Sequence, residues 1–131
     1  GGRILGAAFT HDGKQVVSCG NDKMLRIWKS DDAKLVRTIE GFEATVIRVV
    51  VGDDDRVYSC GADRTVRVHS LDGKQIKKFD DHKDWVYSLA VDNTHGRLAT
   101  GSYDGEIRIR TLDADSEVRA FIGSPGFHTR D

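Results

Sequence analysis

The 131-residue chain has the length of one domain and carries 20 Lys and Arg against 21 Asp and Glu, a net charge of -1. This balance argues against nucleic-acid or acidic-membrane partners, and no run approaches the roughly 18 consecutive apolar residues of a membrane span. Its 38% hydrophobic and 31% charged residues are typical of a folded globular domain, not of a disordered segment.

A short stretch recurs every 41 residues: SCGND at 18–22, SCGAD at 59–63 and TGSYD at 100–104. Each copy follows an apolar residue and precedes a short run rich in β-branched residues. A period in this range is typical of solenoids, propellers and other repeat arrays.

The first unit predicts four strands, at residues 4–9, 15–19, 25–29 and 34–39. An Asp-Gly pair at 12–13 separates the first two, and this pair is a strong hairpin signal because glycine adopts positive φ without strain. The unit is therefore expected to be an antiparallel meander of four short strands.

The second and third units repeat this plan, with length changes that fall only in turns. Their strands are predicted at residues 46–51, 56–59, 66–70 and 75–79, and then at 85–91, 97–100, 107–111 and 117–121. Val, Ile and Thr favour strands, and no window shows a helical apolar stripe. The sequence predicts an all-β protein of three four-stranded antiparallel sheets.

Arg26, Arg67 and Arg108 occupy the same place in the three third strands, on the face opposite the apolar residues. A charged ladder could bind an anion. We favour the alternative that the arginine stems pack between sheets while their heads reach polar partners.

Cys19 and Cys60 also hold equivalent places in successive repeats. Equivalent positions point the same way, so we expect two buried thiols and no disulfide. No C-x-x-C spacing supports a redox or metal role, and cysteine use does not fix the cellular compartment.

The sequences FTHDGK at 9–14, VVSCGND at 16–22 and LRIW at 25–28 resemble the WD-repeat β-propeller family, and the match extends from residue 4 to residue 123. The resemblance implies that each unit is a four-stranded blade packed around a central channel. The single propeller segment, 1–131, would comprise blades at about 4–41, 42–81 and 82–123 and a tail at 124–131.

The resemblance also implies a structural hydrogen-bonded set of His, Ser or Thr, Asp and Trp in each blade. No blade here has all four, and the positions that match are Ser18, Asp22 and Trp28, then Ser59 and Asp63, then His82, Thr100 and Asp104. Phe42 and His69 stand at the His and Trp positions of the second blade, and Arg110 at the Trp position of the third.

In this family, one rim of the propeller binds partners, and the resemblance places peptide or protein binding there. The candidate rim residues are Phe42, Arg64, Lys83, Asp84, Trp85 and Tyr103. Phe42 is the preferred candidate, although it would alternatively fill the space of the missing His. Trp85 is expected to pack at the start of its strand.

A blade is apolar on both faces and therefore needs a neighbouring blade on each side. Closed propellers have about 4–8 blades, so the three blades of this chain are too few to close a ring. The chain is a whole number of units, cut in phase near Ser124. We therefore predict head-to-tail self-association into a closed propeller of six or nine blades, a dimer or a trimer. The alternatives are a piece of a longer natural propeller and a chain made in order to study propeller assembly.

No catalytic, metal or cofactor site is predicted. The five histidines lack metal-site spacing, and no Ser/His/Asp constellation or phosphate-binding glycine motif is readable. We expect a non-catalytic scaffold or interaction module, and an enzyme that uses the propeller channel is the less favoured alternative.

Overall fold

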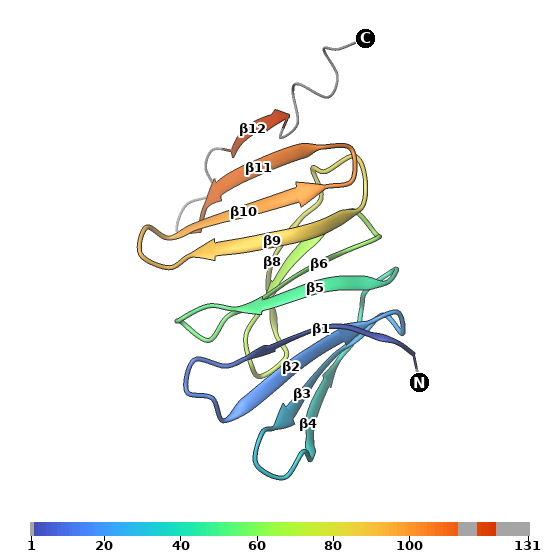
Figure 1. Cartoon of the computed structure of the whole chain (residues 1–131), viewed down its shortest axis with the longest axis vertical. Helices are drawn as coiled ribbons and strands as arrows, with labels where there is room; N and C mark the ends of the chain where they lie inside the picture. Colours follow the sequence, from blue (N-terminus) through green and yellow to red (C-terminus); the bar gives the residue numbers. More distant parts are fainter. Residues whose placement is uncertain (1, 113–117, 123–131) are drawn as a thin grey trace.

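A computed structural model describes residues 2–112 and 118–122, and these residues form twelve strands and no helix. Figure 1 shows three sheets stacked along the long axis of the molecule. The first sheet holds β1 (Ile4–Phe9), β2 (Gln15–Gly20), β3 (Leu25–Lys29) and β4 (Leu35–Ile39). Its strands pair antiparallel in sequence order.

The other two sheets have the same antiparallel order. The second comprises β5 (Val46–Val51), β6 (Val57–Gly61), β7 (Val66–His69) and β8 (Gln75–Phe79). The third comprises β9 (Val86–Asp92), β10 (Arg97–Ser102), β11 (Glu106–Thr111) and β12 (Val118–Ile122). The predicted architecture of three four-stranded antiparallel sheets is confirmed. The predicted strand start at residue 117 and the tail at 124–131 lie outside the described residues.

The second strands run one or two residues further than predicted. Each first strand contains one bulged residue, Leu5, Ile47 or Tyr87, beyond which pairing resumes. Pairing of Val46 with Gly61 therefore continues a strand that was expected to end at residue 59. A Cβ at Gly61 would lie 2.2 Å from the carbonyl oxygen of Thr45, so this close backbone approach favours glycine.

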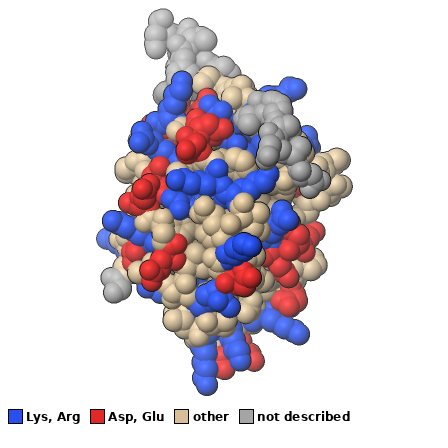
Figure 2. Space-filling view, turned by 180° about the vertical axis from the view of Figure 1, so that it is seen from behind, with Lys and Arg blue, Asp and Glu red and all other residues tan. Residues whose placement is uncertain are grey.

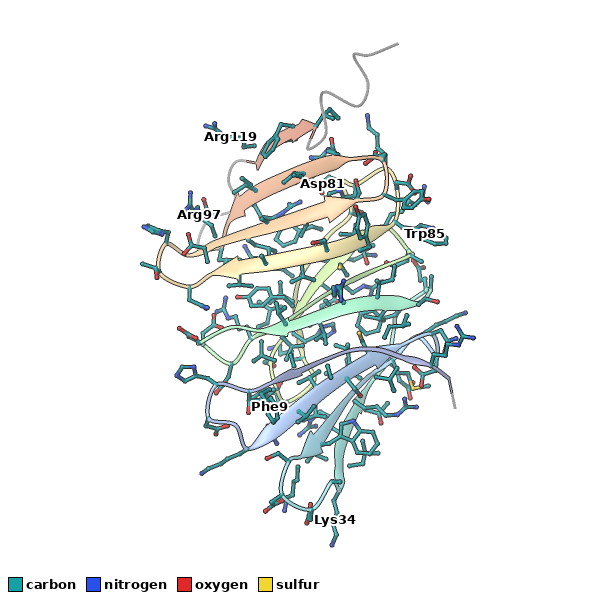
Figure 3. All side chains as sticks on the ribbon, viewed as in Figure 1. Phe9, Lys34, Asp81, Trp85, Arg97 and Arg119 are labelled. Atoms are coloured by element: carbon teal, nitrogen blue, oxygen red, sulfur yellow. The ribbon has the colours of Figure 1, made fainter. Side chains whose placement is uncertain are left out.

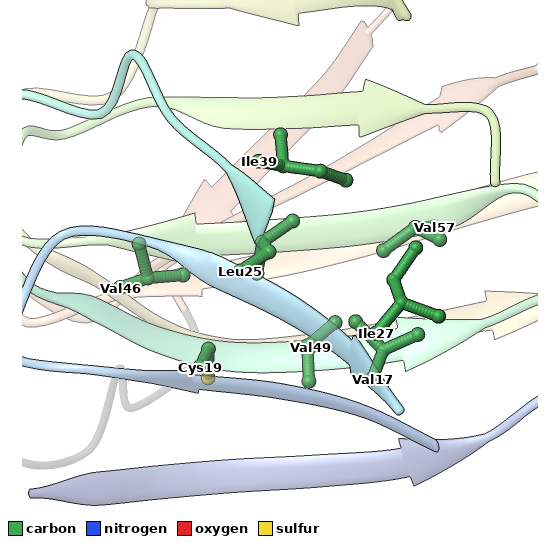
Figure 4. Packing of buried hydrophobic residues seen from close by; sticks show 8 residues of the cluster. All are labelled: Val17, Cys19, Leu25, Ile27, Ile39, Val46, Val49 and Val57. Atoms are coloured by element: carbon green, nitrogen blue, oxygen red, sulfur yellow. The ribbon is translucent and has the colours of Figure 1, made fainter. Parts of the chain in front are cut away.

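Two hydrophobic clusters hold the three sheets together. The first lies between the first and second sheets (Figure 4), where Val17, Leu25 and Ile27 pack with Val49 and Val57. The second joins the second and third sheets through side chains that include Tyr58 and Leu98. Strand β5 thus packs between β1 and β9, as Figure 1 shows.

The outermost faces of the stack lack this cover. Ile4 is 57% exposed, whereas its counterparts Val46 and Val86 in the inner positions are 1% and 0% exposed. At the other end Phe121 is 44% exposed, against 4% for its counterpart Ile39. The exposed and buried residues hold equivalent places in their blades, so the difference comes from the missing neighbour.

Both cysteines are buried free thiols, as predicted. Burial raises the pKa of Cys19 to about 11 and that of Cys60 to about 12. Figure 2 shows that acidic and basic side chains mingle over the side opposite to the view of Figure 1. Opposite charges thus alternate there, without one large field of either sign.

Candidate functional site

The first sheet joins two members of the family's polar set. Trp28 donates from Nε1 to the Oγ of Ser18 at 2.9 Å, across β3 and β2. Asp22, in the following turn, forms a close ion pair with Arg26. The hydrogen bond from Arg26 lowers the pKa of the Asp22 carboxyl.

In the second sheet, Phe42 and His69 contact each other, with ring centroids 5.6 Å apart. Among the described residues neither Ser59 Oγ nor His69 Nδ1 has a hydrogen-bond partner, and both atoms are buried. Burial, and then the positive charge of Arg67, lowers the pKa of His69 to about 4. Phe42 thus packs against His69, and the low pKa of His69 keeps its imidazole neutral at neutral pH.

Arg67 anchors the polar region of this sheet. Its Nη2 lies 3.1 Å from Asp63 Oδ2, in a pair whose side chains are 8% and 7% exposed. Its Nη1 donates to the carbonyl oxygen of Gly41 at 3.0 Å, and its guanidinium lies 4.9 Å above the Phe42 ring. Asp63 also accepts hydrogen bonds from Thr65. This buried pair is thus fully embedded in hydrogen bonds.

The third sheet brings His82 and Thr100 together, with 2.7 Å between Nε2 and Oγ1. The other ring nitrogen of His82 lies 3.6 Å from Glu106 Oε1 and makes no hydrogen bond within the described part of the chain. Burial, and then Arg108, lowers the pKa of His82. The third matching residue of this sheet, Asp104, accepts hydrogen bonds from Ser102 Oγ and from the backbone N–H of Glu106.

Arg110 occupies the tryptophan position of the third sheet. It lies 4.0 Å over the Phe79 ring and donates to Asp81 at 2.8 Å. The third-strand arginines all reach carboxylates, and Arg67 and Arg108 are only 8% and 16% exposed. The part of the interpretation in which the arginine heads reach polar partners is therefore confirmed.

The rim residues of the third sheet are the most exposed aromatic side chains of the candidate set. Trp85 is 54% exposed and Tyr103 73% exposed, and their ring centroids lie 6.5 Å apart. Figure 3 shows Trp85 projecting from the start of β9. Trp85 was expected to pack at the start of its strand, and in the structure its ring lies against Tyr103 while about half of the residue stays exposed.

The remaining rim candidates differ in their surroundings. Asp84 accepts the backbone N–H of Trp85 at 2.8 Å. Arg64 and Lys83 lie on the edge of a mixed-charge hollow of about 470 Å³. Tyr87, whose ring lies 6.4 Å from that of Tyr103, was missed as a rim residue because only its strand position was considered. The repeated bulge re-aims this side chain.

No three described His, Cys, Asp or Glu residues are grouped as metal ligands. Nor does the described part of the chain contain a helix long and apolar enough to cross a membrane.

The family model described as "WD domain, G-beta repeat" matches residues 1–29, 33–70 and 73–110. These matches cover most of the chain. They are offset from the sheets by one strand, since the second match includes β4 with β5–β7 and the third includes β8 with most of β9–β11. The chain therefore belongs to the WD-repeat family.

Curated relatives support this assignment. A guanine nucleotide-binding protein subunit beta-like protein of Encephalitozoon cuniculi is 27% identical over 92% of this chain and 38% of the relative. The ribosome biogenesis protein YTM1 of Kluyveromyces lactis is 30% identical over 73% of this chain and 24% of the relative. The target of rapamycin complex subunit LST8 of Saccharomyces cerevisiae is 24% identical over 81% of this chain and 36% of the relative. The chain thus spans less than two fifths of these relatives.

Among solved structures, U3-55K matches with a TM-score of 0.83 at 22% identity, over 92% of this chain and 37% of that one. This likeness shows the propeller fold.

Proposed function

We propose that this chain is a non-catalytic propeller scaffold that binds proteins or peptides on its rim. The observation that carries the proposal is the exposed aromatic surface at the start of β9 and in the β10–β11 turn. Trp and Tyr are common anchors of protein interfaces. One relative is named as a subunit of a complex and another as a subunit beta-like protein, which is consistent with a role in assemblies.

We also propose that the two outer faces of the stack are covered by head-to-tail association with further copies of the chain. Ile4 and Phe9 are 57% and 65% exposed on the face of the first sheet. Phe121 is 44% exposed on the face of the third. Soluble proteins rarely leave such apolar faces open, and the two faces are the two halves of one blade-to-blade contact.

The sizes of equivalent residues support this pairing. Between the first and second sheets, Val51 packs against the cluster that contains Val17. Between the second and third sheets, the equivalent Val91 packs against the cluster that contains Tyr58. At the junction between copies, the corresponding residues are the large Phe9 and the small Ala99. A large side chain thus faces a small one, which keeps the summed volume of the contact close to that of the inner junctions.

The lengths of the relatives favour a second source of blades, namely further repeats in a longer chain. In that case the outer faces would be covered by blades of a different sequence. The two sources differ in what the 131-residue chain does in solution, because only self-association predicts a defined oligomer of this chain alone.

A pair of one-sided variants tests the association. Phe9→Asp damages the face of the first sheet, and Phe121→Asp damages the face of the third. Each variant alone is expected to close no propeller, whereas a mixture of the two forms a dimer through the one intact junction, measured by sedimentation. Lys34→Asp, at an exposed turn, is the control. If either variant alone keeps the wild-type mass, head-to-tail closure is wrong.

A further inference from the structure

Three aromatic side chains meet at one end of the third sheet, and we call them the aromatic trio. Trp85 precedes β9, Tyr87 is the bulged residue of β9, and Tyr103 lies in the β10–β11 turn. Tyr103 contacts both of the others, with centroid distances of 6.5 and 6.4 Å.

Every blade has the three positions, but only the third fills them with aromatic residues. The counterparts are Arg3, Leu5 and Asn21 in the first sheet and Thr45, Ile47 and Ala62 in the second. One backbone hydrogen bond is common to all three blades: Asn21 to Arg3 at 3.1 Å, Ala62 to Thr45 at 2.9 Å, and Tyr103 to Trp85 at 2.8 Å. The backbone therefore forms without aromatic residues, and the fold does not require the trio.

The trio is also poorly buried. Trp85, Tyr87 and Tyr103 are 54%, 45% and 73% exposed. Large aromatic side chains contribute most to stability when they leave water. Three exposed aromatic side chains, two of which contact the third, suit a partner that buries them.

The charge beside the trio differs from that in the other blades. The turn aspartates Asp22 and Asp63 each pair with the arginine four residues later. In the third blade that arginine, Arg108, is diverted to Glu106 at 2.9 Å and lies 3.5 Å from Asp81.

Asp104, next to Tyr103, is therefore left without its arginine. It is exposed, and within the described ranges no Lys or Arg lies at ion-pair distance from it. Its carboxyl accepts hydrogen bonds only from its own turn. A carboxylate without an arginine partner among the described residues thus remains in the turn that also carries Tyr103.

We propose that the aromatic trio and Asp104 bind a lysine or arginine side chain of a protein partner. The faces of Trp and Tyr rings attract cations, and Asp104 supplies the counter-charge. This site rests on the proposed rim function and specifies the chemistry of its partner. A purely apolar or proline-rich partner would use the rings but would gain nothing from the carboxylate.

Blocked pentapeptides with a central lysine, arginine or norleucine, flanked by glycines, test the site by NMR titration of the full chain. The two indole N–H signals separate Trp85 from Trp28. We expect the lysine and arginine peptides to shift the Trp85 signal saturably and to leave that of Trp28 in place. Norleucine, which keeps the apolar stem and lacks the charge, is expected to bind at least about fivefold more weakly.

Variants assign the effect to the proposed residues. Tyr103→Leu is expected to remove the response, and Asp104→Asn, which keeps a hydrogen-bond acceptor, to weaken lysine binding about threefold or more and to reduce its salt dependence. Ala62→Leu, which changes the position equivalent to Tyr103 in the second blade, is the matched control and is expected to keep full lysine binding. Equal binding of norleucine and lysine, or full lysine binding by Tyr103→Leu, overturns the site.

Sedimentation of the same samples separates this site from the proposed assembly. Absent lysine binding in an intact oligomer overturns the cation site alone. Lysine binding by a chain of monomeric mass overturns the assembly alone.

Discussion

Trp28 donates a hydrogen bond to Ser18 at 2.9 Å, a contact that its counterpart His69 does not make with Ser59. The strand pairing is the same, since Ser18 opposes Arg26 as Ser59 opposes Arg67. Imidazole is shorter than indole, so the buried hydroxyl of Ser59 stays unpaired in the described structure. Neighbouring blades therefore share a backbone and differ in how well their polar groups are satisfied.

Replacing Trp28 tests how much this bond stabilises the first blade. Trp28→Phe leaves Ser18 without its donor and is expected to lower the free energy of unfolding by about 1–2 kcal/mol. Ser18→Ala, alone and combined with Trp28→Phe, completes a double-mutant cycle in urea, with an expected coupling near 1 kcal/mol. Additive effects of the two changes would mean that the bond contributes nothing.

Restoring the family's residues in the second blade is expected to stabilise it. His69→Trp alone introduces a larger side chain against Phe42, with strain of about 1–3 kcal/mol. Phe42→His together with His69→Trp makes room for the indole and gives Ser59 a donor. The double variant is expected to be more stable than either single variant, measured by thermal and urea unfolding. A double variant no better than His69→Trp would refute this account of the orphaned hydroxyl.

The neutral His69 makes stability depend on pH. Its pKa in the folded protein is about 4, below the ordinary value of about 6.5. The unfolded chain therefore binds a proton at a higher pH than the folded protein does. The free energy of unfolding is unaffected by protonation of His69 above about pH 6.5 and falls by about 3 kcal/mol as the pH is lowered toward 4. His69→Phe is expected to flatten this part of the curve of unfolding free energy against pH. Parallel curves for the variant and the wild type would exclude His69 as the cause.

The buried pair of Asp63 and Arg67 predicts a contrast between two identical substitutions. Asp63→Asn leaves Arg67 buried without its charge partner and is expected to lower the unfolding free energy by about 3 kcal/mol. Asp104→Asn occupies the equivalent turn but has no arginine to strand, so its effect is expected to stay below about 1 kcal/mol. Similar losses from both changes, measured in urea, would show that the turn hydrogen bonds dominate.

Much of the fold follows from local patterns in the sequence. The Asp12-Gly13 turn and the β-branched runs predicted the strand order correctly, because hairpins are specified by neighbouring residues. The extra pairing at Gly61 was missed, since a bulge depends on two strands meeting and leaves no local pattern around Ile47.

The candidate site was less accessible from the sequence. The resemblance to the WD-repeat family made Trp85 and Tyr103 candidate rim residues, but it did not show that the ring of Tyr87 lies against Tyr103. The diversion of Arg108 from Asp104 to Glu106 was also hidden, because equivalent spacing suggests equivalent pairs. Comparison of the three blades position by position is the signal that reveals both features.

The central claim is that the two outer faces of this three-blade stack require partners. Equilibrium sedimentation of the full chain at micromolar concentration tests it most directly. The account predicts a single species of twice or three times the 14.5 kDa chain mass, with six or nine blades. A compact 14.5 kDa monomer that unfolds in one cooperative step would contradict it.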